Sequence, residues 1–400
     1  MLILVLALVM AFAALPAFAQ DKADWAFYGQ VRMWTAWESV DEDTPNQLSN
    51  SGFFPVATTS AKAITYGDTR EGDDEFAYLL QGNSRIGANV KWGNIGGRFE
   101  YGSTPNLRLL YGTWNFGSGT LLLGQDYGPY FYLVSGLCGP GGQECNGIGF
   151  GSIYSGRNPQ IKLIFGGLQL AIVKPAQVAS YGPSAGLIDA LDNGTPLNPQ
   201  DPIASANKPG DVDFTLPKLE ASYTFNMGPG QFFIGGVYNT YTEVYNIANS
   251  EVENDVDGWA LGAGTKLAFG PFYANATFQY GSNPNNSGSG PATLYPSVQV
   301  YIPGEDVSDD ASYLAAQLIL GFKLTDSMVF EGGVIWQKGE WENVEQQTWT
   351  YYIGMGWSPA KNFTIVPEFG IVDFNKLETG VGDLDFGKLM WLGIKWQINF

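Results

Sequence analysis

The sequence predicts an all-β protein, a transmembrane barrel of about 16 antiparallel strands. Three observations support this prediction. Short segments alternate between apolar and polar residues with period 2. Glycine is frequent, at 52 of 400 residues, and aromatic residues reach 14% while charged residues reach only 15%, which favours strands and tight turns. Short turns also alternate along the chain with long polar stretches, an asymmetry typical of membrane barrels.

Alternation is clearest in residues 272–280 and 76–92. In the first segment one face carries Phe272, Ala274, Ala276, Phe278 and Tyr280, and the other carries Tyr273, Asn275, Thr277 and Gln279. In the second, one face carries Tyr78, Leu80, Ile86, Ala88 and Val90, and the other carries Gln81, Asn83, Arg85, Asn89 and Lys91. One face suits lipid and the other suits water. A filled β-sandwich is the alternative, but the polar face is long and aligned with the turns, which favours a membrane barrel.

The turns fix the expected number of strands. Short hairpin turns are predicted at 93–94, 117–119, 166–167, 228–230, 270–271, 325–327 and 359–362. Long polar loops are predicted at 40–75, 126–157, 176–213, 243–257, 281–310, 339–345 and 374–386. Roughly seven short turns and two chain ends imply about 16 strands, an even number that brings the termini together. We expect short periplasmic turns and long extracellular loops.

Aromatic side chains flank the short turns and both ends of the mature chain. They are Trp25, Trp92, Trp114, Phe116, Phe225, Phe269, Phe272, Trp357, Phe363 and Trp396. An amphipathic ring is stable at the depth of the lipid headgroups, so this pattern is typical of an interfacial girdle.

Composition excludes several classes of function. The 39 acidic and 20 basic residues give a net charge of −19, which disfavours binding to nucleic acid. Histidine is absent, which removes Ser-His catalysis and every histidine metal site. An aspartic dyad or a Ca²⁺ site built from carboxylates stays possible, but no loop has the acidic spacing of an EF-hand. We therefore predict that the protein is not an enzyme and needs no cofactor or metal.

Residues 1–19 are almost wholly apolar and end in Ala17-Phe18-Ala19, the small-x-small pattern that signal peptidase requires. We interpret them as a cleaved export signal. A single membrane helix is the alternative, because about 18 apolar residues could span a bilayer. Residues 20–400 are then one barrel domain.

The mature chain resembles the general porins of Gram-negative bacteria, particularly those of sulfate-reducing relatives. The resemblance is carried by residues 119–125, Gly-Thr-Leu-Leu-Leu-Gly-Gln, followed by Pro129, which looks like the fifth strand entering a constriction loop. It is carried also by the C-terminal alternation of Trp396, Ile398 and Phe400. The family implies that the terminal Phe is read by the barrel-assembly machinery. It also implies a homotrimer in the outer membrane and a third loop folded into the pore.

Arginines are the candidate pore residues. Strand alternation places Arg32, Arg85 and Arg98 on polar faces. At about 2.5 Å of axial climb per residue, Arg32, Arg85 and Arg108 lie about 17 to 23 Å above the short-turn rim. Arg108 has the parity of a lipid-facing residue, but an arginine there costs roughly 2 to 4 kcal/mol, so we place it inside. We predict a constriction wall, with the alternative that these arginines only neutralise carboxylates such as Glu100.

The loop 126–157 contains Asp126, Glu144, Cys138 and Cys145. Folded inward against the arginine wall, its acidic residues would create a transverse field at the narrowest point. The alternative is an ordinary external loop. Because the two cysteines are close and export exposes them to an oxidising compartment, we predict a disulfide, with two free thiols as the alternative.

Acidic clusters at 41–43, 68–75 and 306–310 lie in predicted external loops. They suit a solvated rim, or bridging by divalent cations to lipopolysaccharide. The predicted function is passive diffusion of small hydrophilic solutes and inorganic ions through a protein embedded in outer-membrane lipid. A substrate-specific, possibly anion-selective channel and a structural or adhesive barrel with a blocked lumen are the alternatives.

Overall fold

The computed structural model describes residues 23–40, 75–103, 106–137, 151–176, 209–247, 250–289, 299–302, 307–342, 344–379, 382–385 and 387–400. These residues form strands and connecting turns. None of them belongs to a helix that is long and apolar enough to cross a membrane.

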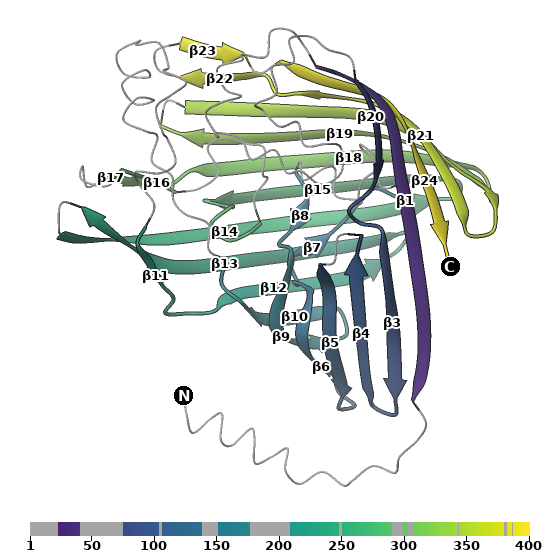
Figure 1. The fold of residues 1–400 in the computed structure, drawn as a ribbon, viewed down its shortest axis with the longest axis horizontal. Coiled ribbons are helices and arrows are strands. Elements are labelled where there is room, and N and C mark those ends of the chain that lie inside the picture. The colour runs from purple at the N-terminus through teal and green to yellow at the C-terminus, as the bar shows by residue number, and fades with distance from the viewer. Residues whose placement is uncertain are drawn as a thin grey trace.

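The described strands form one closed antiparallel wall with sixteen positions around the barrel, as predicted (Figure 1). Twenty strands belong to this sheet, because four positions are each built from two successive strands. In order around the wall they are β1 (Asp24–Val40), β2 (Glu75–Leu80) with β3 (Arg85–Trp92), β4 (Ile95–Gly102), β5 (Leu107–Asn115), β6 (Thr120–Tyr127), β9 (Arg157–Phe165), β10 (Leu168–Val173), β11 (Asp211–Asp213) with β12 (Lys218–Met227), β13 (Gly230–Ile247), β14 (Ser250–Phe269), β15 (Phe272–Ser282), β18 (Ser312–Thr325), β19 (Met328–Trp341), β20 (Val344–Ala360), β21 (Phe363–Asp373) with β22 (Lys376–Thr379), and β23 (Gly382–Asp385) with β24 (Lys388–Asn399).

The first and last strands close the wall. β1 pairs with β24 from Gln30↔Asn399 to Val40↔Leu389. The Gly29 N–H donates to the Phe400 carbonyl oxygen at 2.6 Å, and the Phe400 N–H donates to the Gly29 carbonyl oxygen at 2.9 Å. The ring of Phe400 lies against Gly29, where any Cβ would clash with it. Closure leaves no free edge strand in the wall.

Apolar side chains face outward and polar side chains face inward. On β20, Ile353 is 60% exposed, whereas the inward-facing Thr350 is fully buried. On β15, Phe278 is exposed on the outside and Gln279 is buried inside. An apolar outer surface with a polar interior is the reverse of a sandwich core, so the sandwich alternative is wrong.

All seven predicted short turns are present, and they lie on one rim, which we call the short-turn rim. Glycines with positive φ occupy five of them, and Gly117, with a φ of 93°, is one. The other four are Gly93, Gly166, Gly228 and Gly270. The φ values of these four lie between 56° and 61°, in the left-handed region that glycine adopts without steric cost. The opposite end of the barrel is the long-loop rim.

Three predicted loops are largely strands instead. The predicted loop 374–386 contains β22 and β23, which pair from Lys376↔Asp385 to Thr379↔Gly382. Residues 243–257 belong to the β13–β14 ribbon, which is paired out to Ile247↔Ser250, and residues 339–345 belong almost entirely to the β19–β20 hairpin. In the β13–β14 ribbon the outward positions are the exposed Glu251, Glu253, Asp255 and Asp257. These strands continue past the apolar band, so their outer face is charged and the alternation that marks a membrane strand is missing.

The predicted single strand 76–92 is divided. β2 and β3 both pair with β1, but residues 81–84 between them are not strand. Four short strands lie outside the barrel wall. They are β7 (Phe131–Tyr132) paired with β8 (Ile153–Tyr154), and β16 (Val300–Ile302) paired with β17 (Val307–Asp309).

Candidate pore constriction

The third loop of the long-loop rim connects β6 to β9 and folds into the barrel. The structure describes its two arms, residues 128–137 and 151–156. The arms are joined by the short pairing of β7 with β8. The rings of Phe131 and Tyr154 lie 5.9 Å apart, and the ring of Tyr127 lies 4.5 Å from that of Phe131. The predicted inward loop after the fifth wall strand is therefore present.

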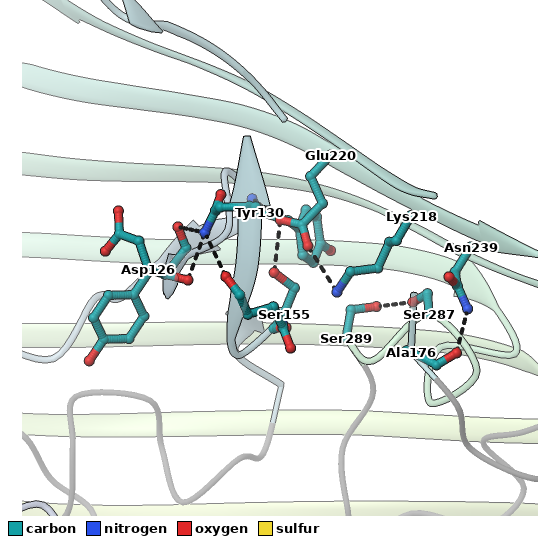
Figure 2. Close-up of polar contacts among 12 residues, drawn as sticks. Asp126, Tyr130, Ser155, Ala176, Lys218, Glu220, Asn239, Ser287 and Ser289 are labelled. Atoms are coloured by element: carbon teal, nitrogen blue, oxygen red, sulfur yellow. Dashed lines mark hydrogen bonds and ion pairs between the residues drawn. The ribbon is translucent and has the colours of Figure 1, made fainter. Parts of the chain in front are cut away.

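Glu220 on β12 holds both arms where they enter the lumen (Figure 2). Its carboxylate accepts hydrogen bonds from the Tyr130 N–H at 3.0 Å and from the Ser155 hydroxyl at 2.9 Å. Its other oxygen lies 3.0 Å from Lys218 Nζ. Glu220 and Lys218 are buried, so each charge depends on the other and on the loop donors for compensation.

Glu331 on β19 holds the far end of the first arm. It accepts hydrogen bonds from the Ser135 hydroxyl at 2.6 Å and the Gly136 N–H at 2.7 Å. The hydroxyls of Tyr273 and Tyr352, from β15 and β20, donate to the same carboxylate at 2.6 and 2.8 Å. One buried carboxylate thus joins three wall strands to the loop.

Further contacts show the course of the loop along the inner wall. Burial and the Glu220 charge raise the pKa of the Tyr130 phenol, which donates as a neutral group to the Gln279 side chain at 3.0 Å. Asn275 donates to the Val134 carbonyl at 2.7 Å, and Lys395 on β24 donates to the Leu137 carbonyl at 2.6 Å. The described arm therefore runs from β12 past β15 and β19 to β24.

The arginine cluster lies on β3, β4 and β5, strands that these loop anchors leave uncovered. Its centre is Glu100 on β4, which is fully buried. Arg98 and Arg108 each lie 2.8 Å from its carboxylate, and Arg85 lies 3.5 Å from it. The Tyr28 hydroxyl donates to Glu100 at 2.8 Å. Three of the arginines therefore compensate a wall carboxylate, as the alternative interpretation of the sequence expects, and their role as a constriction wall stays a prediction.

Exposure separates the three arginines. Side-chain exposure is 32% for Arg98, 17% for Arg85 and 3% for Arg108. Arg98 is also bonded to the Tyr28 hydroxyl at 2.9 Å and lies over the Tyr28 ring. Of these three side chains, that of Arg98 is the most exposed.

A β-bulge places Arg108 inside. Pairing of β4 with β5 shifts register here, with Glu100 opposite Leu109 and Tyr101 opposite Leu107, so Arg108 is the extra residue. The bulge reverses the parity of the strand below it, and Trp114 still faces outward. The inward placement inferred from the cost of a lipid-facing charge agrees with this geometry.

Arg32 on β1 is buried beside the break between β2 and β3. The backbone N–H of Arg32 donates to the Ser84 hydroxyl oxygen at 2.9 Å, and the backbone carbonyl of Arg32 accepts from the Gln81 N–H at 2.9 Å. The residues 81–84 thus satisfy the backbone of Arg32 in place of a regular ladder, which explains why the predicted strand is divided. Arg32 is less exposed than Arg98, and Lys395 on β24 lies diagonally across the strand pairing from it.

Asp126 lies at the end of β6 and is bound to Lys162 Nζ at 2.7 Å, and the same ammonium donates to the Tyr127 carbonyl at 2.9 Å. Its charge is therefore paired with a neighbouring wall strand.

Glu144, Cys138 and Cys145 lie outside the described residues, as do residues 1–19. The acidic loop and the disulfide stay predictions.

Comparison with known proteins supports the architecture. No protein-family model and no curated protein matches the chain. Among solved structures, the outer membrane channel DcaP of Acinetobacter baumannii aligns with a TM-score of 0.61 at 16% identity, over 96% of this chain and 100% of that one. The anion-selective porin from Comamonas acidovorans aligns with a TM-score of 0.53 at 11% identity, over 95% of this chain and 100% of that one. A trimer form of the outer membrane protein OmpT of Vibrio cholerae aligns with a TM-score of 0.52 at 12% identity, over 95% and 100%.

The chain has the fold of an outer-membrane porin. At these identities the likeness concerns the fold alone, and it does not support the narrower resemblance to porins of sulfate-reducing bacteria.

The sequence did not reveal which wall residues of this porin fold anchor the third loop. Glu220 and Glu331 lie on the inward faces of apolar strands. A charged residue in the middle of such a strand is the sequence signal that could have identified them as candidate anchors. The sequence does not show which distant loop atoms they bind, because Ser135 and Glu331 are almost two hundred residues apart.

The C-terminal residues Trp396, Ile398 and Phe400 all face outward and are exposed. Trp396 Nε1 donates to the Thr35 hydroxyl at 3.1 Å across the closing seam. Their placement gives one apolar stripe on the last strand, and a role as assembly signal stays a prediction.

Proposed function

We propose that the chain is an outer-membrane channel for the passive diffusion of small hydrophilic solutes and ions. The observation that carries this proposal is the arrangement of the lumen. The third loop is anchored to β12, β15, β19 and β24, and the arginine cluster lies on β3, β4 and β5. A path between a loop and a facing charged wall is the arrangement of a selective pore.

The wall would act on solutes through charge at short range. Arg98 keeps its charge at all relevant pH values, and Glu100 and Tyr28 hold its guanidinium in one orientation. A fixed positive group in a narrow lumen raises the local concentration of anions. We therefore propose a weak anion preference, to which Arg32, Arg85 and Arg108 contribute. The structurally similar Comamonas protein is an anion-selective porin, which is consistent with this proposal.

The remaining expectations belong to the same proposal. We propose an exported, non-catalytic protein whose signal peptide is residues 1–19 and whose loop carries a Cys138–Cys145 disulfide. A homotrimer is supported by the trimer form of the Vibrio protein. Lipopolysaccharide and the barrel-assembly machinery, which would read Phe400, are the other proposed partners.

Conductance of the purified protein in planar bilayers tests the function. Open, ohmic steps are expected. Steps that one class of solute blocks at low concentration would favour the substrate-specific channel. A folded protein that inserts and stays silent would contradict the proposal and favour a structural barrel with a blocked lumen.

A further inference from the structure

A second segment also enters the barrel. Residues 283–289, which we call the inner coil, begin the sixth loop directly after β15. They form a compact set of turns, in which the Asn286 N–H donates to the Asn283 carbonyl at 2.9 Å and the Ser289 N–H donates to the Pro284 carbonyl at 3.0 Å. Asn283, Asn286 and Ser287 are fully buried. A polar segment with this degree of burial is packed against other protein atoms rather than extended into solvent.

The inner coil is bound to the lumen face of β13. Asn239 donates to the Asn286 carbonyl at 2.8 Å. It also donates to the Ala176 carbonyl at 3.0 Å, which ties the coil to the start of the fourth loop (Figure 2). Asn286 in turn donates to the Tyr241 hydroxyl at 2.8 Å. Because Asn239 and Tyr241 point into the barrel, the coil occupies part of the lumen.

Gly258 on β14 lets the inner coil pack directly on the wall. A Cβ at this position would lie 2.6 Å from the Ser287 nitrogen and 2.8 Å from the Asn283 carbonyl oxygen. Side chains of residues in real structures do not approach backbone atoms so closely, so the contact requires glycine. The coil therefore packs closely against β13 and β14, and we call this contact surface, formed by Asn239, Tyr241 and Gly258, its seat.

The seat lies toward the long-loop end of the barrel, at and above the highest anchors of the third loop. Of these anchors, Glu220 and Gln279 are eight residues above their short turns, about 20 Å up, and Gln337, which accepts from the Gly151 N–H, is ten residues above its turn, about 25 Å up. The lower anchors of the third loop are Asn275 and Glu331. Asn275, which binds the third loop, is four residues above its short turn and hence about 10 Å up. Asn239 and Tyr241 are ten and twelve residues above theirs, about 25 to 30 Å up. The two inward segments also use different anchors, Glu220, Asn275 and Glu331 for the third loop and Asn239, Tyr241 and Gly258 for the coil.

We infer that the inner coil is a second narrowing of the lumen, held by its own anchors on the long-loop side of Asn275 and Glu331, and that it limits the size of solutes that enter. The inference rests on the proposed channel function. Several polar side chains of the coil are bonded within the protein, including Asn283, Asn286 and the mutually bonded Ser287 and Ser289. The coil therefore selects by size rather than by a particular ligand chemistry.

Polymer exclusion tests the inference. Neutral polyethylene glycols of graded size are added to one side of a bilayer and then to the other, and the conductance of single wild-type channels is recorded. A polymer from the long-loop side stops at the coil, whereas one from the short-turn side advances to the third loop. Wild-type channels should therefore show different polymer cut-offs on the two sides.

The variant N239A/N286A removes the side chains that hold the coil. It should raise conductance and increase the cut-off on the long-loop side alone, reducing the asymmetry. Y241F removes only the hydroxyl that accepts from Asn286, and should give a smaller shift of the same sign in a barrel that is otherwise intact. N275A, which loosens the third loop instead, is the matched control and should leave the long-loop cut-off unchanged.

The outcomes separate the two proposals. Conducting channels with equal cut-offs on both sides, or with an asymmetry unchanged in both N239A/N286A and Y241F, would overturn the second narrowing and leave the channel function standing. Absence of conductance in the wild-type protein would overturn the channel function itself.

Discussion

Single carboxylates organise both sides of the lumen. Glu100 brings guanidinium groups together on one side, and Glu331 brings hydroxyl and N–H donors from the loop and the wall together on the other. A buried carboxylate is tolerated only where donors replace its water. Each acid therefore fixes several neighbours at once, and its removal should affect all of them.

Replacing Glu100 with Gln should strengthen anion preference and weaken the barrel. The substitution removes one negative charge beside Arg85, Arg98 and Arg108, so the wall becomes more positive. Loss of one partner of a buried ion pair costs about 3 to 5 kcal/mol. Reversal potentials measure the first effect, and urea unfolding in detergent measures the second.

Asp326→Asn is the control for Glu100→Gln, because Asp326 pairs with Lys323 at a fully exposed turn. Exposed pairs contribute little to stability, so this variant should unfold like the parent. An unchanged reversal potential in E100Q would show that the cluster does not face the conducting path.

At the scale of elements, the sequence predicts what local chemistry determines. The turns were predictable because Gly93 and Gly270 supply the left-handed backbone that tight hairpins need. Strand number and closure followed from the turns. The inward third loop came from resemblance and not from periodicity, because its anchors Glu220 and Glu331 are distant in the sequence.

The misses have physical reasons. The ribbon that includes Glu251 to Asp257 projects beyond lipid, so water faces its outer side and no apolar periodicity marks it. The bulge at Arg108 depends on pairing with Glu100 on another strand. The inner coil depends on Gly258, whose need for a small residue appears only when Ser287 is packed against it.

Glu331→Gln should loosen the third loop. The amide keeps the shape of the side chain but loses the charge that accepts from Ser135, Gly136 and the two tyrosines. Hydrogen bonds to a charged group are worth about 1.5 to 3 kcal/mol each. We expect higher open-channel noise and faster cleavage of the loop by added protease.

The matched control is Glu243→Gln, another buried lumen carboxylate, which accepts from Tyr245 and Asn254 on the β13–β14 ribbon. This variant should keep the noise level and the loop protection of the parent. Equal protease resistance in E331Q and wild type would mean that Glu331 does not hold the loop in place.

Deletion of Phe400 should reduce the amount of protein assembled in the outer membrane without blocking export. The deletion removes two backbone hydrogen bonds to Gly29 and the ring that covers it. Phe400→Ala keeps the backbone bonds and removes only the ring, so it separates seam closure from recognition of the aromatic end. Cell fractionation measures both, and normal outer-membrane levels of both variants would rule out an assembly role for Phe400.

The molecule as a whole separates charges of opposite sign along its axis. The net charge is −19, and the exposed acids Glu251 to Asp257 lie at the long-loop rim. Arg98 lies near the opposite end of the lumen, more than about 20 Å lower by the rise of the strands. Net charge is therefore a poor guide to the preference of the pore.

Ionic strength decides which charge dominates. The Debye length is about 3 Å in molar salt and about 30 Å at 0.01 M. The acidic residues of the long-loop rim therefore influence ions at the constriction only in dilute salt. We expect a weak anion preference in molar salt that diminishes or reverses in dilute salt. Sequence reasoning assigns this effect to Arg32 and Arg85, but the greater exposure of Arg98 makes Arg98→Gln the sharper variant.

In molar salt R98Q should move the reversal potential toward cations, because it removes the guanidinium most exposed to solutes. Lys376→Gln is the control. Lys376 is a charge at the long-loop rim, paired at 3.8 Å with Asp383, and its effect at the constriction should be screened in molar salt. In dilute salt K376Q should begin to change the ion selectivity, because the Debye length is then comparable with the distance from the long-loop rim to the constriction. A parental reversal potential for R98Q in molar salt would exclude Arg98 from the filter.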